Sequence, residues 1–525
     1  MRNSIIAGLG ATLIFTSLTA FSQDLAKGYV YHDANGNGKK QRREAGLAGV
    51  SISNGHEVVQ TDEKGYYEIG LEDGQLLFVI KPTGYTVALD SLNKPQFYYI
   101  HKPSGSPELK YAGSAPTGDL PKEINFAMTA VEEKDDFTAL IFGDPQPYTL
   151  EEVDFFDRGI VSEVEGIQNV AFGLSLGDLV GDDLSLFGPY AKAVAKVGLP
   201  WYNVMGNHDQ NYDVESDELA DEAFEAHFGP SAYAYNVGKV HFIVLDDILW
   251  PDPRDKQGYW GGLRPDQLDF LGNDLKFVPK DHLIVISMHI PLAEEGDSFR
   301  DEDRQEIFDL LADFPNTLSL SAHTHLQKQD LFYKKDGWRQ EKPHHHYNVG
   351  TTSGDWYKGT LDEKGIPVST MRDGTPKGYA LIHFDGNQYK IRYQVAGKSS
   401  DYQMEIFAPK VLEKDKRTTA GIFVNFFMGS EGDEVLIKVD EGEWKAASKV
   451  EDYDPAYLVD LYQWDVTEEL IDGRRPSNPA ASKHLWRGGI PAGLEAGEHV
   501  IRIQATDRFG QVHSGETVFK VVEKK

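Results

Sequence analysis

Short motifs rich in aspartate, asparagine and histidine recur along the middle of this 525-residue chain, each directly after a short apolar run. Carboxylate and amide oxygens combined with imidazole nitrogens suit Mn, Fe, Zn or Mg-like ions, and the absence of cysteine excludes thiolate sites. Two such ions about 3.5–4 Å apart orient a phosphate and generate hydroxide between them. The motifs therefore predict a site for two divalent metal ions. They are Asp144-Pro145-Gln146, Gly177-Asp178, Gly206-Asn207-His208-Asp209, His289 and His323-Thr324-His325.

The elements that must position these motifs follow an α/β pattern. Strands are expected at 138–142, 170–176, 201–205, 240–245, 283–288 and 317–320, and amphipathic helices at 153–165, 218–228, 265–277 and 304–314. In open α/β sheets ligands bind at the carboxyl ends of strands. One of the motifs follows the carboxyl end of each of five of these strands. A single aspartate there is usually a turn residue, and a single histidine is usually hydrogen-bonded. Aspartate, asparagine and histidine residues after five strands together favour a metal site.

The order of the motifs resembles that of the calcineurin-like metallophosphoesterase superfamily, which is D-x-H, G-D, G-N-H-[DE], a lone histidine and G-H-x-H. The resemblance covers residues 136–385, about half of the chain. It implies an α/β fold, a four-layer α/β/β/α sandwich with the site at the sheet tips. In this chain two small all-β domains are expected to flank it.

The resemblance also implies a role for each ligand. Asp144 and His325 would bind the first metal, and Asp178 would bridge both metals. Gln146 stands where many relatives carry histidine, so an amide oxygen would hold the first metal and favour Mn or Mg-like ions over Zn. Ala322 replaces a glycine, which is a minor departure. The implied ligands of the second metal, besides the bridge, are Asn207, His289 and His323.

His208 is implied to stabilise the developing charge or to protonate the leaving oxygen, with Asp209 orienting its ring. Tyr148 and Asp182 stand close to the metal-binding turns and are candidate rim residues without an assigned role. Trp356 would either form an aromatic wall for a base or sugar with its neighbour Tyr357, or pack the loop.

Two further clusters have alternative interpretations. The loop from Asp33 to Glu44 fits the calcium pattern D-x-[DN]-x-[DN]-G-x5-E, with Asn35 and Asn37 as the other oxygen donors. The alternative is an Asn/Gly-rich hairpin stabilised by its own turns. The histidine triplet at 344–346 would either assist phosphate binding or be exposed or hydrogen-bonded.

Composition divides the chain into four parts. Arg2, the apolar stretch 5–20 and the small residues before Gln23 predict a signal peptide over 1–22 and an exported, periplasmic or secreted protein. Short alternating segments predict an N-terminal β-sandwich-like domain over 24–130. The phosphoesterase domain is expected over 135–395 and a C-terminal β domain over 401–525.

The net charge of the chain argues against one class of partner. The 83 acidic and 52 basic side chains give a net charge of -31, which argues against extended nucleic-acid contacts. No later stretch has the length of a membrane span. The expected partner is a small phosphorylated substrate, and the expected reaction is hydrolysis of a phosphate monoester, diester or diphosphate by a two-metal-activated hydroxide. The alternative is a non-catalytic, exported metal- or ligand-binding protein with a degenerate site.

Overall fold

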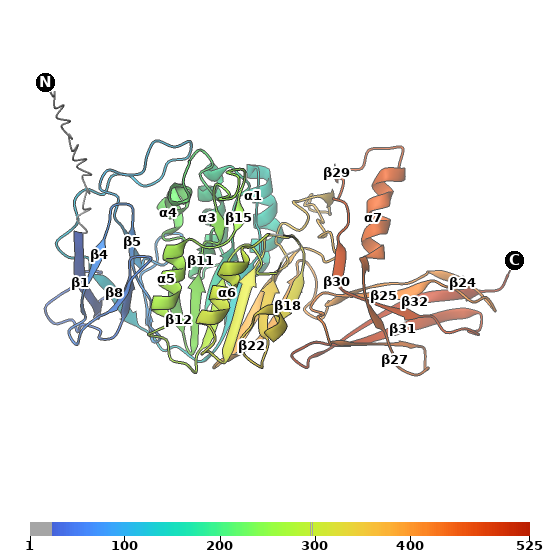
Figure 1. Ribbon diagram of the computed structural model, residues 1–525. Coiled ribbons are helices and arrows are strands. Elements are labelled where there is room, and N and C mark those ends of the chain that lie inside the picture. Colours follow the sequence, from blue (N-terminus) through green and yellow to red (C-terminus); the bar gives the residue numbers. More distant parts are fainter. Residues whose placement is uncertain (1–23, 294–295, 297, 525) are drawn as a thin grey trace, which may run out of the picture.

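The computed structural model describes residues 24–293, 296 and 298–524. The predicted signal peptide lies outside these residues. Figure 1 shows three parts in a row: an N-terminal β part in blue, a central α/β part, and a C-terminal part in orange and red. Nowhere in the described ranges is there a helix both long enough and apolar enough to span a membrane.

Two mixed sheets face each other in the central part. In the first sheet, with strand order β11-β10-β9-β21-β22, strands β9, β10 and β11 are parallel. In the second, with order β12-β13-β16-β17-β19-β18, the four inner strands are parallel. The first sheet comprises β9 (Asp136–Phe142), β10 (Phe172–Leu176), β11 (Trp201–Val204), β21 (Gly378–Asp385) and β22 (Gln388–Val395). The second comprises β12 (Tyr233–Val237), β13 (Val240–Val244), β16 (Leu283–Ser287), β17 (Asn316–Ser321), β18 (Lys328–Phe332) and β19 (His344–Asn348).

Aromatic side chains fill the space between the two sheets. The ring of Phe242 on β13 lies 5.2 Å from Phe172 on β10 and 5.4 Å from Phe384 on β21. Tyr235 on β12 stacks on the same Phe242 ring at 5.0 Å. All four side chains are buried. Edge-to-face and offset contacts of this kind add to the free energy of burial, so this layer joins the sheets.

Helices cover the outer faces of both sheets. Phe156 and Phe187 pack with Phe142 on the outer face of the first sheet, whereas Phe270 and Phe308 belong to the core of the second. This confirms the expected α/β/β/α layers with β-rich parts at both ends. The helices are α1 (Leu150–Phe156), α2 (Ser162–Val164), α3 (Phe187–Ala195), α4 (Glu222–Phe228), α5 (Pro265–Asp274) and α6 (Asp301–Leu310). A π-helical turn (Asp157–Val161) joins α1 to α2, and 3-10 turns occur at Leu184–Leu186, Asp217–Leu219 and Lys334–Asp336.

The N-terminal part consists of two four-stranded sheets, β4-β1-β8-β6 and β3-β2-β5-β7. The predicted boundary at 130–135 falls between β8 and β9. The strands are β1 (Asp24–His32), β2 (Ser51–Ser53), β3 (Val58–Gln60), β4 (Tyr66–Leu71), β5 (Leu76–Val79), β6 (Tyr85–Thr86), β7 (Tyr98–Ile100) and β8 (Phe126–Ala130).

The C-terminal part consists of the sheets β23-β25-β30-β28 and β24-β32-β31-β26-β27. The predicted boundary at 395–401 falls between β22 and β23, and both domain boundaries stay predictions. The strands are β23 (Met404–Phe407), β24 (Val411–Glu413), β25 (Gly421–Phe426), β26 (Glu434–Val439), β27 (Lys445–Ala446), β28 (Ser448–Tyr453), β30 (Ala481–Gly489), β31 (Gly497–Thr506) and β32 (Val512–Val522). Two small ribbons, β14 (Ile248–Leu249) with β15 (Trp260–Gly261) and β20 (Gly359–Thr360) with β29 (Gly473–Arg474), lie outside the larger sheets.

One helix departs from the all-β expectation for the C-terminal part. Helix α7 (Pro455–Val466) begins after Asp454, whose carboxylate accepts a hydrogen bond from the Tyr457 backbone N–H at 2.8 Å. Pro455 occupies the first turn, where its missing N–H has no helical partner to lose. An N-cap residue followed by proline is a local signal for the start of a helix. Because the surrounding segments predict strands, the sequence did not lead to an expected helix here.

The aromatic layer between the sheets predicts a large cost for Phe242→Ala. Loss of a buried phenyl group together with the cavity it leaves should lower the free energy of unfolding by about 3–5 kcal/mol. Phe277, which is 41% exposed, provides the matched control, and Phe277→Ala should cost less than about 0.5 kcal/mol. Urea denaturation followed by circular dichroism measures both values. Equal effects of the two substitutions would contradict the role given to the layer.

Candidate metal centre

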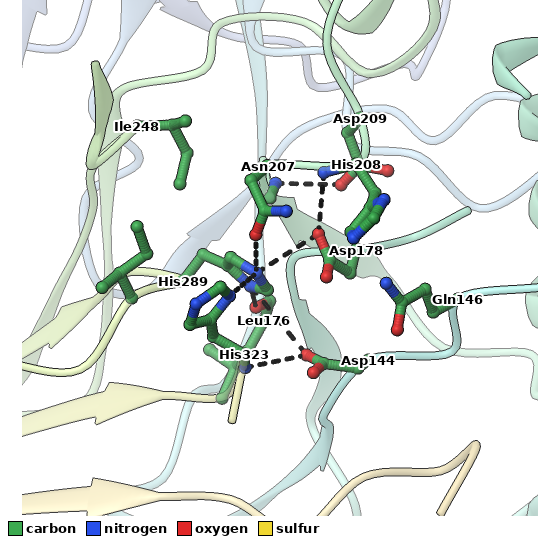
Figure 2. Close-up of polar contacts among 12 residues, drawn as sticks. Asp144, Gln146, Leu176, Asp178, Asn207, His208, Asp209, Ile248, His289 and His323 are labelled. Atoms are coloured by element: carbon green, nitrogen blue, oxygen red, sulfur yellow. Dashed lines mark hydrogen bonds and ion pairs between the residues drawn. The ribbon is translucent and has the colours of Figure 1, made fainter. Parts of the chain in front are cut away.

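Five strands deliver the predicted ligands to one edge of the paired sheets. Strands β9, β10 and β11 end just before the motifs that contain Asp144, Asp178 and Asn207, and β16 and β17 end before His289 and His323. Parallel pairing places the carboxyl ends of neighbouring strands together, and Figure 2 shows the resulting cluster. The convergence on which the metal prediction depended is therefore present.

The first group of donors surrounds His289. Its Nε2 atom lies 3.1 Å from Asn207 Oδ1, 3.2 Å from Asp178 Oδ1 and 3.2 Å from His323 Nδ1 (Figure 2). Donor atoms around a metal ion with bonds of about 2.0–2.2 Å are separated by about 3.0–3.5 Å. The donor atoms of Asp178, His289 and His323 all lie within 4.8 Å of one another. These four residues, the predicted second-metal set, have the spacing of a coordination shell.

The second group contains Asp144, Gln146 and His325. His325 Nε2 lies 2.7 Å from Gln146 Oε1 and 3.2 Å from Asp144 Oδ2. Asp144 Oδ2 is buried without a hydrogen-bond partner, which is costly for a carboxylate oxygen unless a cation meets it. The structure thus brings Gln146 to the position predicted for a ligand of the first metal. The two groups meet where Asp144 Oδ1 approaches His289 Nδ1 at 3.9 Å.

Backbone carbonyls fix the tautomers of two of these histidines. Nδ1 of His289 donates to the Leu176 carbonyl at 2.8 Å, and Nδ1 of His325 donates to the Gly354 carbonyl at 2.7 Å. Whenever either ring is neutral, its Nε2 atom therefore presents a lone pair toward the neighbouring oxygen atoms. Second-sphere carbonyls commonly orient metal-bound imidazoles in this way. The residues therefore fit a pair of divalent cations.

The protonation states agree with this fit. Burial lowers the pKa of His323 and of His325 to about 3, so both rings are neutral at pH 7. Burial also disfavours protonation of His289, but Asp178 and Asp144 outweigh it and raise its pKa to about 10. A divalent cation between the same groups would take the place of that proton.

Strained backbone conformations cluster at the ligands. A positive φ is rare for residues other than glycine and persists only where the surroundings enforce it. The predicted ligands with a positive φ are Asp144 (29°), Gln146 (39°), Asp178 (46°), His323 (66°) and His325 (52°). At Gly177 a Cβ atom would lie 2.4 Å from His289 Nδ1, and at Gly206 it would lie 2.1 Å from the Asp178 backbone nitrogen. The two glycines before the ligands therefore permit a close approach that any side chain would prevent.

His208 lies beside this cluster with its side chain 25% exposed. Its ring Nδ1 is 2.6 Å from Asp182 Oδ1, which also accepts a hydrogen bond from the Tyr212 hydroxyl at 3.1 Å. Burial opposes protonation of the ring, but the charges of Asp178 and Asp182 outweigh burial and raise the pKa of His208 to about 9. At pH 7 the His208 ring is therefore protonated on both nitrogens and positively charged.

The expectation that Asp209 orients the His208 ring is wrong. Asp209 Oδ2 accepts hydrogen bonds from the Leu179 and Gly206 backbones at 3.0 and 2.9 Å, and Oδ1 accepts one from Val180 at 3.1 Å. Asp209 thus ties two ligand-bearing turns together. Asp182, noted from the sequence only as a rim residue, takes the expected place beside the imidazole.

The aromatic residues near the site have distinct positions. The Trp356 ring stacks on His325 at 3.9 Å with an interplanar angle of 20°. Tyr357 is buried, and its hydroxyl donates to the Pro145 carbonyl, so it packs the loop. The Tyr148 hydroxyl accepts a hydrogen bond from Gln146 Nε2 at 3.3 Å. Trp356 and Tyr148 thus flank the Gln146 and His325 side of the site.

The histidine triplet does not reach the site. It lies on β19, buried, where His344 is 2.8 Å from both Thr317 Oγ1 and Ser319 Oγ. His346 is 2.7 Å from Ser319 Oγ and 2.8 Å from Ser321 Oγ. Of the two interpretations, the hydrogen-bonded one holds.

The predicted calcium loop closes on itself through hydrogen bonds. The Asp33 carboxylate accepts from the backbones of Asn37 and Gly38 at 3.2 and 2.7 Å. Asn35 Nδ2 donates to Glu44 Oε1 at 3.2 Å, which brings the two ends of the motif together. Calcium binding by this loop stays a prediction.

Models of one protein family match most of the chain. A model of the calcineurin-like phosphoesterase matches residues 131–327, which contain the predicted ligands. Models described as the N terminal and the C terminal of calcineurin-like phosphoesterase match residues 34–111 and 346–513. No curated protein matches the chain significantly.

Among solved structures, a purple acid phosphatase from yellow lupin (Lupinus luteus) seeds is 12% identical, with a TM-score of 0.37 over 66% of this chain and 68% of that one. CopC from Methylosinus trichosporium OB3b is also 12% identical, with a TM-score of 0.13 over 23% of this chain and 96% of its own.

The geometry predicts that His325→Ala removes one of two metal ions. Among the predicted ligands, the His325 imidazole contacts Asp144 and Gln146, so the group around His289 should keep its ion. Equilibrium dialysis against Mn²⁺ followed by metal analysis should give about two ions per wild-type chain and about one per variant. His383 on β21, with its side chain 45% exposed, provides the control, and His383→Ala should bind as the wild type does. Loss of both ions in His325→Ala would contradict the division into two groups.

Proposed function

Because the chain belongs to the calcineurin-like phosphoesterase family, we propose that it hydrolyses a phosphate ester, either a monoester, a diester or a diphosphate, with two divalent metal ions. The observation that carries the proposal is the pair of donor groups around His289 and His325, with an unpartnered Asp144 oxygen between buried side chains. When bound, two such ions polarise the phosphate and lower the pKa of a water molecule.

The chain's own residues supply the remaining chemistry. His208 holds a proton on a ring that Asp182 orients through Nδ1, which leaves Nε2 to protonate the leaving oxygen or to stabilise charge on the phosphate. Asp209 keeps the turn of Asp178 and the turn of Asn207 in register by accepting their backbone N–H groups. Positioning of this kind supplies much of the rate enhancement in phosphoryl transfer.

The alternative, a metal-binding protein without turnover, depends on Gln146. A neutral amide is a weaker ligand than imidazole, so the first site could remain empty at physiological metal concentrations. An assay with p-nitrophenyl phosphate, bis-p-nitrophenyl phosphate and a nucleotide diphosphate sugar in the presence of Mn²⁺ separates the two. Turnover that EDTA abolishes and Mn²⁺ restores supports the hydrolase. One bound ion with no turnover on any of the three would favour the binding protein.

We expect His208→Ala to reduce kcat about 10²–10⁴-fold, because a general acid contributes that much to a rate. Metal content should not change, since the His208 ring lies outside both donor groups. Steady-state kinetics and metal analysis of the same preparation measure the two quantities. Unchanged kcat would contradict the assignment of His208.

A second substitution tests the corrected partner of that histidine. Asp182→Asn keeps the size of the side chain but removes the charge that orients the imidazolium, so kcat should fall about 10–100-fold. Asp183→Asn is the matched control, because Asp183 Oδ1 bonds Ser185 instead. If the control variant lost as much activity as Asp182→Asn, the pairing would not explain the effect.

A further inference from the structure

A short strand of the C-terminal part pairs with the catalytic part beside the metal centre. Gly359 and Thr360 on β20 pair antiparallel with Arg474 and Gly473 on β29. Gly473 has φ of 112°, and a Cβ atom there would lie 2.2 Å from the Gly359 carbonyl oxygen. This pairing therefore requires glycine, both for its conformation and for the close approach.

The strand presents the guanidinium of Arg474 to two separate segments. One nitrogen donates to the carbonyls of Trp356 and Tyr357 at 2.7 and 3.1 Å. The same nitrogen lies 2.6 Å from Glu152 Oε1, and the Glu152 side chain is only 7% exposed. Arg474 is thus a junction between the segment after residue 350 and the start of α1.

The first of these segments supports one half of the metal centre. The Gly354 carbonyl accepts from His325, and the Trp356 ring stacks on the same imidazole. The Tyr357 hydroxyl donates to the Pro145 carbonyl, in the turn between two predicted ligands. This segment holds His325 from two sides.

The second segment supports Gln146. Glu152 Oε2 accepts a hydrogen bond from the Tyr148 backbone N–H at 2.7 Å. The Tyr148 hydroxyl in turn accepts from Gln146 Nε2 at 3.3 Å, which leaves Gln146 Oε1 facing His325. Both supports of the Asp144, Gln146 and His325 group therefore meet at Arg474.

The other donor group is held from within the central sheets. His289 is oriented by the Leu176 carbonyl of β10, and Asp247 accepts the His289 backbone N–H at 3.0 Å. Asp178 receives the His208 backbone N–H at 3.0 Å. These contacts involve only residues of the central part, so support from Arg474 is specific to one group.

We propose that Arg474, presented by the β29 strand, is a positioning residue that keeps Asp144, Gln146 and His325 in the geometry that binds the first metal ion. The inference rests on the proposed two-metal function. It makes the C-terminal part a structural component of the metal centre and not merely a cover. The second metal site is independent of Arg474.

The test compares adjacent arginines. Arg475 forms an exposed ion pair with Asp465 and serves as the matched control. Equilibrium dialysis of the full chain against Mn²⁺ should show that Arg474→Ala weakens one of two sites about 10–100-fold, as loss of outer-sphere support usually does. The other site, and both sites of Arg475→Ala, should match the wild type. Arg474→Lys should restore binding only in part, because the lysine side chain is shorter and its flexible, strongly hydrated ammonium is held less firmly at these acceptors.

Two further measurements separate positioning from a loss of folding. The electron paramagnetic resonance spectrum of the Mn²⁺-loaded wild type should be that of a coupled pair of ions. The spectrum of Arg474→Ala should be that of a single ion, while circular dichroism shows an intact fold. Trp356→Leu, which leaves the strand pairing and Arg474 in place, should weaken the same site. Two unchanged sites in Arg474→Ala, or equal losses in Arg475→Ala, would overturn the inference. Absence of Mn²⁺ binding by the wild type would instead overturn the proposed function as well.

Discussion

Lone pairs of buried side chains face one another across 2.7–3.2 Å at the edge where the two central sheets meet. The Gly354 carbonyl already accepts the other ring proton of His325, so this neutral ring has no hydrogen to offer the oxygens of Asp144 and Gln146 opposite it. Such contacts are repulsive in a medium of low dielectric constant, and a divalent cation converts each of them into an attraction. The arrangement of the whole central part serves to hold these groups against that repulsion.

The scaffold resists this repulsion by being stiff. Parallel strands deliver the ligands, and the aromatic layer around Phe242 joins the two sheets behind them. Positive φ angles at Asp144, Asp178 and His323 store backbone strain where the chain turns out of the sheet. Hydrogen bonds from three backbone N–H groups to Asp209 tie the turn of Asp178 to the turn of Asn207. A ligand set built on rigid strand ends needs little reorganisation when metal binds.

The sequence predicted the strand ends and the convergence of the donor residues because both depend on local signals. Each motif is an apolar run followed by a donor residue, with a glycine before Asp144, Asp178 and Asn207. Residues whose roles depend on distant segments were harder to assign. Asp182 rather than Asp209 meets the His208 ring, and no spacing rule distinguishes two aspartates that both lie near metal-binding turns. The histidine triplet at 344–346 was a candidate for phosphate binding, but His344 and His346 contact hydroxyls on the neighbouring β17 strand. The partner of His345 is the Tyr389 hydroxyl. Strands β21 and β22, which complete the first sheet, carry no motif, and their place follows only from long-range pairing.

The contact between Glu152 and Arg474 joins positions 322 residues apart in the chain. During synthesis the seven donor residues emerge before Arg474. The chain between them has to be made and folded before Arg474 can reach Glu152. Long-range pairings of this kind form late, because the entropy of closing a large loop must be offset first. A nascent chain would therefore expose an unfinished donor cluster from the synthesis of His325 at least until that of Arg474. Selection of the right ion would then fall to the compartment in which the chain completes its folding.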